Sequence, residues 1–396
     1  MKPRSIGFPC ARHESAEVRE FLPPLFGFLQ QFGLDRVVIE EGYGQRMAIP
    51  AASYDAALPG LQRGTREQAL SQELVVMLRC PSMPDLRRLR PGAVLVAMLH
   101  FPTRPERAAL MEALRVTGVA MDQIVDDLGR RLIENLEAVG FNGVRVGMEA
   151  LASTWPGFDS PERPPLHATV LGGGAVGAHA VRAAVRYGDD QVRARLGAAG
   201  VAGVRVTVLD VELTQNGPLL DDVLRTTDLL VDATQRRDVS RPVVRNDQLA
   251  HLPAHAVIVD LSVDPYDFDR NPPAVRGLEG IPEGTLDQYV FAPDDPAWDL
   301  LDARVPHAAR RTVASCYSWP GIRPVDCMTV YGKQLEPVLR ALIERGTDLP
   351  AQGGTWAERA TGRGCHRRWV MGGRDLIEAA GGALLRAEIT SKAGSR

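Results

Sequence analysis

The sequence predicts an α/β fold in which helices cover mainly parallel β-sheets. Short apolar runs bounded by proline or glycine recur along the chain, and such runs are typical of buried parallel strands. One run, at residues 167–171, continues into a glycine-rich loop and then an amphipathic helical pattern. A proline-rich stretch at 153–166 precedes it and indicates a linker. The 396 residues suffice for two or three domains, each with its own core.

Five apolar runs in the first third of the chain are expected to form strands of one sheet. They lie at residues 5–8, 36–40, 74–78, 93–99 and 119–121. Helical patterns accompany them at 17–31 (interrupted near Pro23 and Pro24), at the end of 42–57, at about 127–140 and at 144–152. This alternation of strands and helices predicts a doubly wound parallel sheet.

Arg79 and His100 directly follow two successive predicted strands. Because ligands bind at the carboxyl ends of parallel strands, both residues are candidates for a functional site. Histidine exchanges protons near neutral pH, and the arginine fork fits a carboxylate. A structural histidine that caps a strand end is the alternative interpretation of His100.

The glycine-rich loop at residues 172–177 has the spacing G-x-G-x-x-G. Gly172 permits a tight turn, Gly174 lets the backbone approach a pyrophosphate, and Gly177 lets the helix pack on the strand. Ala175 and Val176 begin the helix, whose first N–H groups face the phosphates. The loop therefore predicts a dinucleotide site, with a purely structural glycine turn as the alternative.

Acidic residues follow two later predicted strands. Asp210 comes directly after the run 204–209. A carboxylate at this position can bind both hydroxyls of the adenosine ribose and repel a 2′-phosphate, so NAD is favoured over NADP. Asp264 follows the run 256–263 near the expected nicotinamide, and a helix or turn cap is its other interpretation. The remaining expected elements are an extended helix end and loop at 189–203, a strand at 227–232, an irregular segment at 267–302, a turn at 318–322, and helices at 328–346 and 376–385.

The composition is that of a soluble globular protein without a strong charge bias. Lysine and arginine number 46 against 49 acidic residues, which gives a net charge of −3. We therefore expect neither a nucleic-acid nor a membrane partner. The N-terminal segment lacks the apolar core of a signal peptide, so a cytoplasmic location is expected. The five cysteines are scattered without C-x-x-C spacing, and neither disulfides nor a metal site are expected.

Together these features resemble the alanine dehydrogenase and transhydrogenase-type family and its relative, the lysine-forming saccharopine dehydrogenase. The resemblance extends from about residue 5 to residue 345. The stretches that carry it are Ile6-Gly-Phe-Pro9 with Arg19-Glu-Phe-Leu-Pro23, Leu78-Arg-Cys-Pro81, Leu99-His100, the loop at 172–177, Val259-Asp-Leu-Ser-Val-Asp264 and Trp319-Pro-Gly-Ile-Arg-Pro324. Asp127-Leu-Gly-Arg-Arg131 is more similar to the D-Q-G-R-R of the saccharopine branch.

The resemblance implies two Rossmann-like doubly wound domains with the active site in the cleft between them. A substrate domain is expected from residues 1–135 plus 320–396, and a dinucleotide-binding domain from 136–319. NAD is the implied cofactor, an amino acid or 2-oxo acid the implied substrate, and a homo-oligomer the implied assembly. The roles implied for single residues are acid–base catalysis by His100, carboxylate binding by Arg19 and Arg79, binding of a second carboxylate by Arg131, contact with the nicotinamide ribose by Asp264, and cofactor binding by Ser262.

Arg79 occupies the position of the family's catalytic lysine. An arginine, whose pKa lies above about 12, can hold an anion but cannot act as a base. His100 then remains as the expected acid–base group. The stretch Arg323-Pro-Val-Asp-Cys327 also departs from the family's P-R-T/E-S, so we expect a substrate other than alanine or saccharopine.

Three functions are compatible with these residues. The first is an NAD-dependent amino-acid or opine-type dehydrogenase, in which hydride passes between the nicotinamide and the α-carbon and Asp264 orients the ribose or a water. The second is a cyclodeaminase-like enzyme that recycles its bound NAD internally. The third is an NAD-binding sensor that lost catalysis together with the lysine.

Overall fold

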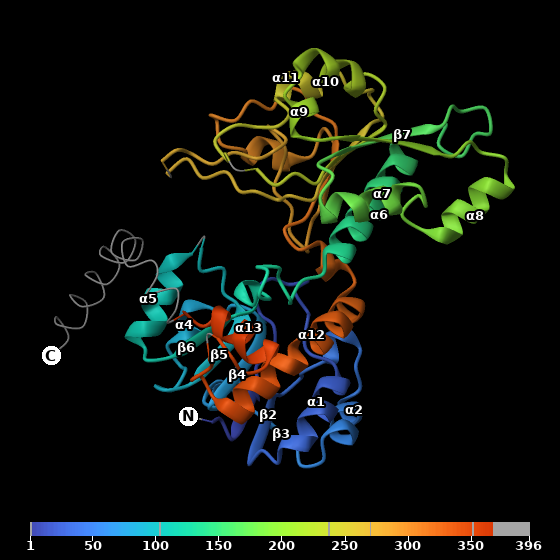
Figure 1. Ribbon diagram of the computed structural model, residues 1–396. Helices are drawn as coiled ribbons and strands as arrows, with labels where there is room; N and C mark the ends of the chain where they lie inside the picture. The colour runs from blue at the N-terminus through green and yellow to red at the C-terminus, as the bar shows by residue number, and fades with distance from the viewer. Residues whose placement is uncertain (1, 103, 237, 270, 351, 367–396) are drawn as a thin grey trace. The chain divides into compact units, whose positions relative to one another are not determined.

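The computed structural model describes residues 2–366, except 103, 237, 270 and 351 (Figure 1). The chain divides into two compact units. The described residues of Met1–Glu134 and Pro324–Arg396 form the first unit, and those of Asn135–Arg323 form the second. The helix predicted at 376–385 lies outside the described residues.

The first unit is built on a six-stranded parallel sheet with the order β3-β2-β1-β4-β5-β6. Its strands are β1 (Ser5–Phe8), β2 (Arg36–Glu40), β3 (Gln62–Gly64), β4 (Leu74–Arg79), β5 (Val94–Met98) and β6 (Thr117–Ala120). All five predicted strands are confirmed. The short polar β3 gives no apolar run and was not predicted. Because β1 lies between β2 and β4, the winding direction reverses at β1 and β4, and a crevice forms at such a point.

Helices cover both faces of this sheet. They are α1 (Pro23–Leu29), α2 (Ala51–Ala57), α3 (Arg66–Leu70), α4 (Met83–Leu86), α5 (Pro105–Ala113), α12 (Pro324–Arg345) and α13 (Trp356–Gly364). Alternate residues of β4 enter two different cores: Leu74 and Val76 pack with α1 and α12, whereas Val75 and Met77 pack with α5. Burial on both faces explains why β4 is almost continuously apolar.

The helix predicted over 17–31 begins only at Pro23. Proline is tolerated in the first turn of a helix but disrupts a helix interior, so the two prolines mark the start of α1 rather than an interruption. The segment before Pro23 is irregular and carries the buried Glu17 and Arg19. The helix prediction is therefore wrong for residues 17–22, the stretch that carries Glu17 and Arg19.

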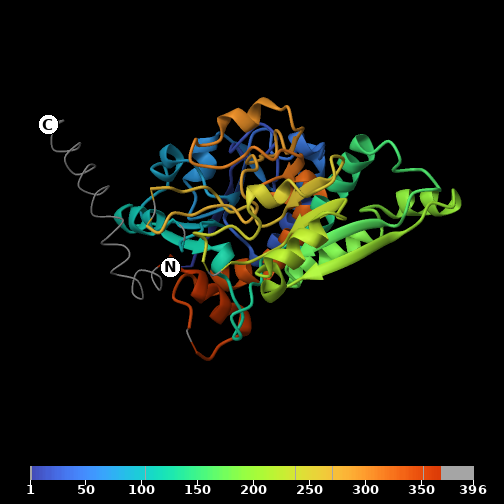
Figure 2. The ribbon, with the colours of Figure 1, turned by 90° about the horizontal axis from the view of Figure 1, so that it is seen from above.

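The second unit contains a six-stranded sheet with the order β11-β12-β10-β9-β7-β8, and it is coloured from green to orange in Figure 1 and Figure 2. All strand pairs are parallel except β11 with β12. The strands are β7 (Leu166–Leu171), β8 (Val204–Leu209), β9 (Leu229–Asp232), β10 (Val257–Asp260), β11 (Val290–Phe291) and β12 (Thr312–Ser315). The helices are α6 (Leu136–Thr154), α7 (Ala175–Ala184), α8 (Asp190–Ala198), α9 (Val211–Thr214), α10 (Gly217–Leu224) and α11 (Asn246–Leu249). Two mostly parallel sheets with helices confirm the predicted α/β class.

Two helix predictions in this part are wrong. The helices expected at 127–140 and 144–152 are one helix, α6, which begins at Leu136. It continues through Gly140 because a Cβ there would lie 2.7 Å from His179 Cβ, so the glycine permits close packing of α6 on α7. The segment 189–203 contains a separate helix, α8, because the Asp189 side chain accepts hydrogen bonds from Gln191 N and Val192 N and caps it.

Candidate functional site

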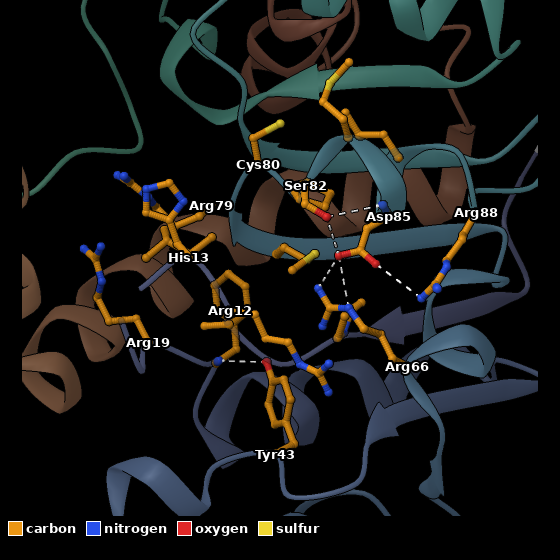
Figure 3. Close-up of a pocket in the computed structure, with 18 of the residues that line it drawn as sticks. Arg12, His13, Arg19, Tyr43, Arg66, Arg79, Cys80, Ser82, Asp85 and Arg88 are labelled. Carbon is orange, nitrogen blue, oxygen red and sulfur yellow. Dashed lines mark hydrogen bonds and ion pairs between the residues drawn. The ribbon is translucent and has the colours of Figure 1, made fainter. Parts of the chain in front are cut away.

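A cavity of about 510 Å³ lies in the first unit where β1 and β4 end (Figure 3). Small-molecule sites usually have volumes of about 300–1,000 Å³. The segment after β1, the end of β4 and the α4 region supply most of its lining, as expected at a switch point of the sheet. Its polar lining is dominated by six arginines: Arg12, Arg19, Arg66, Arg79, Arg88 and Arg107.

Glu17 and Arg19 form a buried ion pair at this cavity. Arg19 Nε donates to Glu17 Oε1 at 2.8 Å, and Arg19 Nη2 donates to Glu17 Oε2. The Glu17 side chain is fully buried, and that of Arg19 is 3% exposed. Burial raises the pKa of Glu17, but hydrogen bonds and charge from Arg19, together with the charge of Arg79, outweigh it and hold this pKa below its ordinary value. The fork of Arg19 is therefore already engaged by a carboxylate of the chain itself.

Arg79 lies at the end of β4 and is more accessible than Arg19. Its Nε is 3.9 Å from Glu17 Oε2, and its side chain is 25% exposed. Figure 3 shows His13 beside Arg79. Burial and the charge of Arg79 lower the pKa of His13 below 6.5, which favours neutral imidazole at pH 7. The structure thus gathers the predicted Arg19 and Arg79 with His13, which was not predicted; the signal available was its position just after β1, at the switch point.

His100 is held in an uncommon backbone conformation after β5. Its φ is 51°, and Asp122 Oδ1 accepts hydrogen bonds from Leu99 N (2.9 Å) and His100 N (3.0 Å). Asp122 Oδ2 lies 3.7 Å from His100 Nδ1. Burial lowers the pKa of His100, Asp122 opposes this shift, and nearby arginines including Arg79 and Arg107 lower it further. A conformation that is stabilised only by its surroundings is typical of functional sites.

Arg107 and Arg131 differ in their relation to the cavity. Arg107, from α5, lines it and donates from Nη1 to Leu99 O at 3.0 Å. The sequence did not single out Arg107, because it is one of many arginines in helical segments. Arg131, the predicted reader of a second carboxylate, donates from Nη2 to Ile133 O at 3.3 Å. Among the described residues, neither Arg131 nor His100 is part of the cavity lining, although both Arg107 and Arg131 act on the pKa of His100.

The glycine loop of the second unit has the geometry of an anion-binding turn. Gly172 has a φ of 92°, and the loop leads from β7 into α7, which begins at Ala175. A Cβ at Gly174 would meet no heavy atom within 4 Å, so the backbone faces open space there. The N–H groups of Ala175, Val176 and Gly177 belong to the first turn of α7 and have no partner within the helix. These groups could bind a pyrophosphate.

The three other predicted cofactor contacts lie in the same unit. Asp210 Oδ1 accepts a hydrogen bond from Leu213 N at 3.2 Å and caps α9, which leaves Oδ2 for another donor. Ser262 Oγ lies 3.0 Å from both Asp232 Oδ2 and Asp260 Oδ1. Burial and the charge of Asp260 raise the pKa of Asp232 to about 6.

Asp264 interacts with an arginine of its own unit. Arg236 Nη2 donates to Asp264 Oδ2 at 2.6 Å, and the Arg236 side chain is 7% exposed. The alternative interpretation of Asp264 as a cap has no support in the hydrogen bonds of the described residues. Its predicted contact with a ribose remains a prediction.

Replacing Gly177 by alanine is expected to destabilise the second unit by about 1–3 kcal/mol. A Cβ at this position would lie 2.0 Å from Gly172 O, so the loop must move away from the helix. Urea unfolding followed by circular dichroism measures the loss. Gly174→Ala is the matched control, because its Cβ enters open space. Equal stability of the two variants would contradict the proposed packing role of Gly177.

Comparison with known proteins finds a family model that matches part of the first unit. Residues 25–135 match the alanine dehydrogenase/PNT, N-terminal domain family. The matched residues include Arg79, His100, Arg107 and Asp122. The predicted resemblance to alanine dehydrogenase and transhydrogenase-type proteins is confirmed for this domain, whereas the likeness to the saccharopine branch stays a prediction.

Curated relatives match longer parts of the chain at low identity. The chain is 24% identical over 255 residues to an alanine dehydrogenase of Methanococcus maripaludis, covering 58% of this chain and 64% of that protein. An alanine dehydrogenase of Mycobacterium tuberculosis is 26% identical over 303 residues, covering 70% of this chain and 74% of that protein.

Two solved structures share the fold. An L-alanine dehydrogenase matches with a TM-score of 0.66 and 18% identity, covering 91% of this chain and 94% of that chain. A transhydrogenase from Sinorhizobium meliloti matches with a TM-score of 0.58 and 18% identity, covering 85% and 94%. In the part of the chain that the structure describes, no helix is long and apolar enough to cross a membrane. The same residues contain no group of three His, Cys, Asp or Glu that could hold a metal ion.

Proposed function

We propose that this protein is an NAD-dependent amino-acid or opine-type dehydrogenase. The observation that carries the proposal is the cavity at the β1–β4 switch point, which presents Arg79 beside His13. His100, whose pKa is lowered in part by the charge of Arg79, follows the neighbouring strand β5, and the chain's relatives are named alanine dehydrogenases. The division into units Met1–Glu134 with Pro324–Arg396 and Asn135–Arg323 supports the predicted substrate unit (1–135 plus 320–396) and dinucleotide unit (136–319), with boundaries shifted by one and four residues.

The second unit supplies groups that fit NAD. The first turn of α7 offers unpaired N–H groups to a pyrophosphate, and the open space at Gly174 admits it. Asp210 retains one carboxylate oxygen for the ribose hydroxyls, which supports NAD over NADP. Ser262 and Asp264 would lie near the nicotinamide ribose. When bound, NAD would accept a hydride from the α-carbon of the amino acid.

The first unit supplies binding and proton transfer. Arg79 binds the α-carboxylate, while Glu17, held by Arg19, fixes the position of the Arg79 guanidinium. His100, neutral because its pKa is lowered, takes a proton from the substrate amine or from the water that attacks the imine. Asp122 fixes the turn that carries His100. Arg79 replaces the family lysine only as an anion holder, since a guanidinium keeps its proton.

Reductive amination provides the direct test. Purified protein is incubated with NADH, ammonia and a panel of 2-oxo acids, and in reverse with NAD and amino acids, while NADH absorbance is followed. We expect turnover with at least one 2-oxo acid and its amino acid. NADH binding without oxidation of NADH across the panel would reject the dehydrogenase. Ammonia release from an amino acid without net change in NADH would support the cyclodeaminase-like alternative instead.

A further inference from the structure

The cavity of the first unit contains more positive charge than its own carboxylates balance. Among the described residues, five of its six arginines form ion pairs with Glu17, Glu40 and Asp85, so these three carboxylates are shared. Arg107 has no carboxylate partner in the described part of the chain. A fourth carboxylate, Glu14, acts on the pKa of His13. The cavity therefore attracts anions, because a cleft lined by one sign of charge concentrates ligands of the opposite sign.

At one end of the cavity, a single carboxylate forms ion pairs with two arginines. Figure 3 shows Arg19, Arg79 and His13 grouped there, and Glu17 pairs with both arginines. Arg107 lies near this end as well, because its Nη1 donates to Leu99 O, and Leu99 follows Met98, the β5 residue that pairs with Arg79 of β4. Because the Arg19 fork is engaged by Glu17, Arg79 and Arg107 are the side chains placed to hold the carboxylate of a ligand.

At the other end, three arginines share two carboxylates. Arg66 is 9% exposed, and it donates from Nη1 to Glu40 Oε2 and from Nη2 to Asp85 Oδ2, both at 2.8 Å. Arg12 pairs with the same Glu40, and Arg88 Nη1 lies 3.6 Å from Asp85 Oδ1. Arg66 thus gives each of the two carboxylates a hydrogen-bonded partner, and three arginines against two carboxylates leave a net positive charge at this end.

The two more exposed arginines at this end are therefore available to a ligand. The Arg12 and Arg88 side chains are 61% and 53% exposed. Figure 3 shows Arg66, Asp85 and Arg88 on the opposite side of the cavity from Arg19 and Arg79. Positive charge is present at both ends, and the volume of about 510 Å³ leaves room for a chain longer than a three-carbon acid.

We propose that the ligand of this cavity is a dicarboxylate, an amino or 2-oxo acid with a second carboxylate. One carboxylate binds Arg79 and Arg107, and the second binds Arg12 and Arg88. Charge-assisted bonds from guanidinium to carboxylate are the strong hydrogen bonds of such sites. The redox role of the ligand rests on the proposed function, whereas its dicarboxylate character rests on the cavity alone.

Binding of unreactive acids tests this without turnover. Isothermal titration of the full-length protein, with no NAD present, compares succinate, glutarate and adipate with butyrate, valerate and hexanoate of the same chain lengths. We expect at least one dicarboxylate to bind tenfold or more tightly than its matched monocarboxylate. The double variant Arg12→Gln, Arg88→Gln is expected to lose about tenfold in dicarboxylate affinity and much less in monocarboxylate affinity.

Controls separate this site from general charge effects. Arg90→Gln also removes a positive charge close to α4, but Arg90 pairs with Glu73 and is not part of the described lining, so the preference should persist. Equal affinities within every matched pair, or tighter binding of inorganic phosphate than of any dicarboxylate, would overturn the proposal. A dicarboxylate preference without NADH oxidation would reject the dehydrogenase and leave the dicarboxylate site standing.

Discussion

Replacing His100 with alanine is expected to lower kcat for amino-acid oxidation by about 100- to 10,000-fold, the usual contribution of a positioned acid–base group. Arg79 cannot take over this role, because its guanidinium does not release a proton at neutral pH. Steady-state kinetics with the best substrate of the panel measure the effect. His251→Ala, which changes a half-exposed histidine of the second unit, is the control. Full turnover of the His100 variant would remove His100 from proton transfer.

The pH profile provides a second readout of the same group. Because the pKa of His100 is lowered, oxidation should stay active below pH 6.5 and fall only at more acidic pH. Asp122→Asn removes the carboxylate that opposes the shift, so the acidic limb should move to lower pH. Arg107→Gln removes a charge that lowers this pKa, so the limb should move to higher pH. Shifts in the same direction would exclude His100 as the titrating group.

Replacing Glu17 with alanine is expected to reduce the free energy of unfolding of the first unit by about 3–5 kcal/mol, because it leaves Arg19 buried without a counter-charge. Urea unfolding monitored by circular dichroism measures the loss. The pKa of Glu17 lies below its ordinary value of 4.5, so the pair stabilises the fold above pH 4.5, and this contribution is lost as the pH falls through the lower, folded-state pKa. The difference between variant and parent should shrink accordingly in acid.

An exposed ion pair is the control for this second prediction. Asp35 pairs with Arg4 at 2.6 Å, but the two side chains are 60% and 68% exposed. Asp35→Ala should change stability much less than Glu17→Ala, because water solvates the remaining charge. Similar losses in the two variants would contradict the role assigned to burial.

The sequence was most informative where a buried strand has a simple physical pattern. Parallel strands covered on both faces are mostly apolar, and the runs predicted at 74–78 and 167–171 therefore show in the sequence. The short polar β3 has no such pattern. The helix boundaries failed where glycine acted as a packing residue inside α6, because sequence alone does not show which glycines face a neighbouring helix.

The site was predictable only where a strand end marks it. Arg79 and His100 follow strands, so their positions could be inferred. His13, Arg107 and Arg88 come from loops or helices, and only folding brings them near β4. The partner of Arg19 was also hidden: Glu17 lies two residues away in a stretch expected to be helical, where a local bidentate pair is not anticipated. The unpredicted part of the site therefore consists of charged side chains whose partners depend on how the backbone folds.

The order in which these units can fold during synthesis follows from how the chain is divided between them. Residues of α12, such as Met328 and Leu335, pack in the same core as Ile6 and Phe8 of β1. Asn135–Arg323 is contiguous in sequence and can close its contacts as soon as it leaves the ribosome. The unit with the arginine-lined cavity begins synthesis first, but its core is incomplete until α12 has been made. The apolar residues that α12 will cover therefore stay exposed while the second unit is synthesised, and they depend most on protection from aggregation during that time.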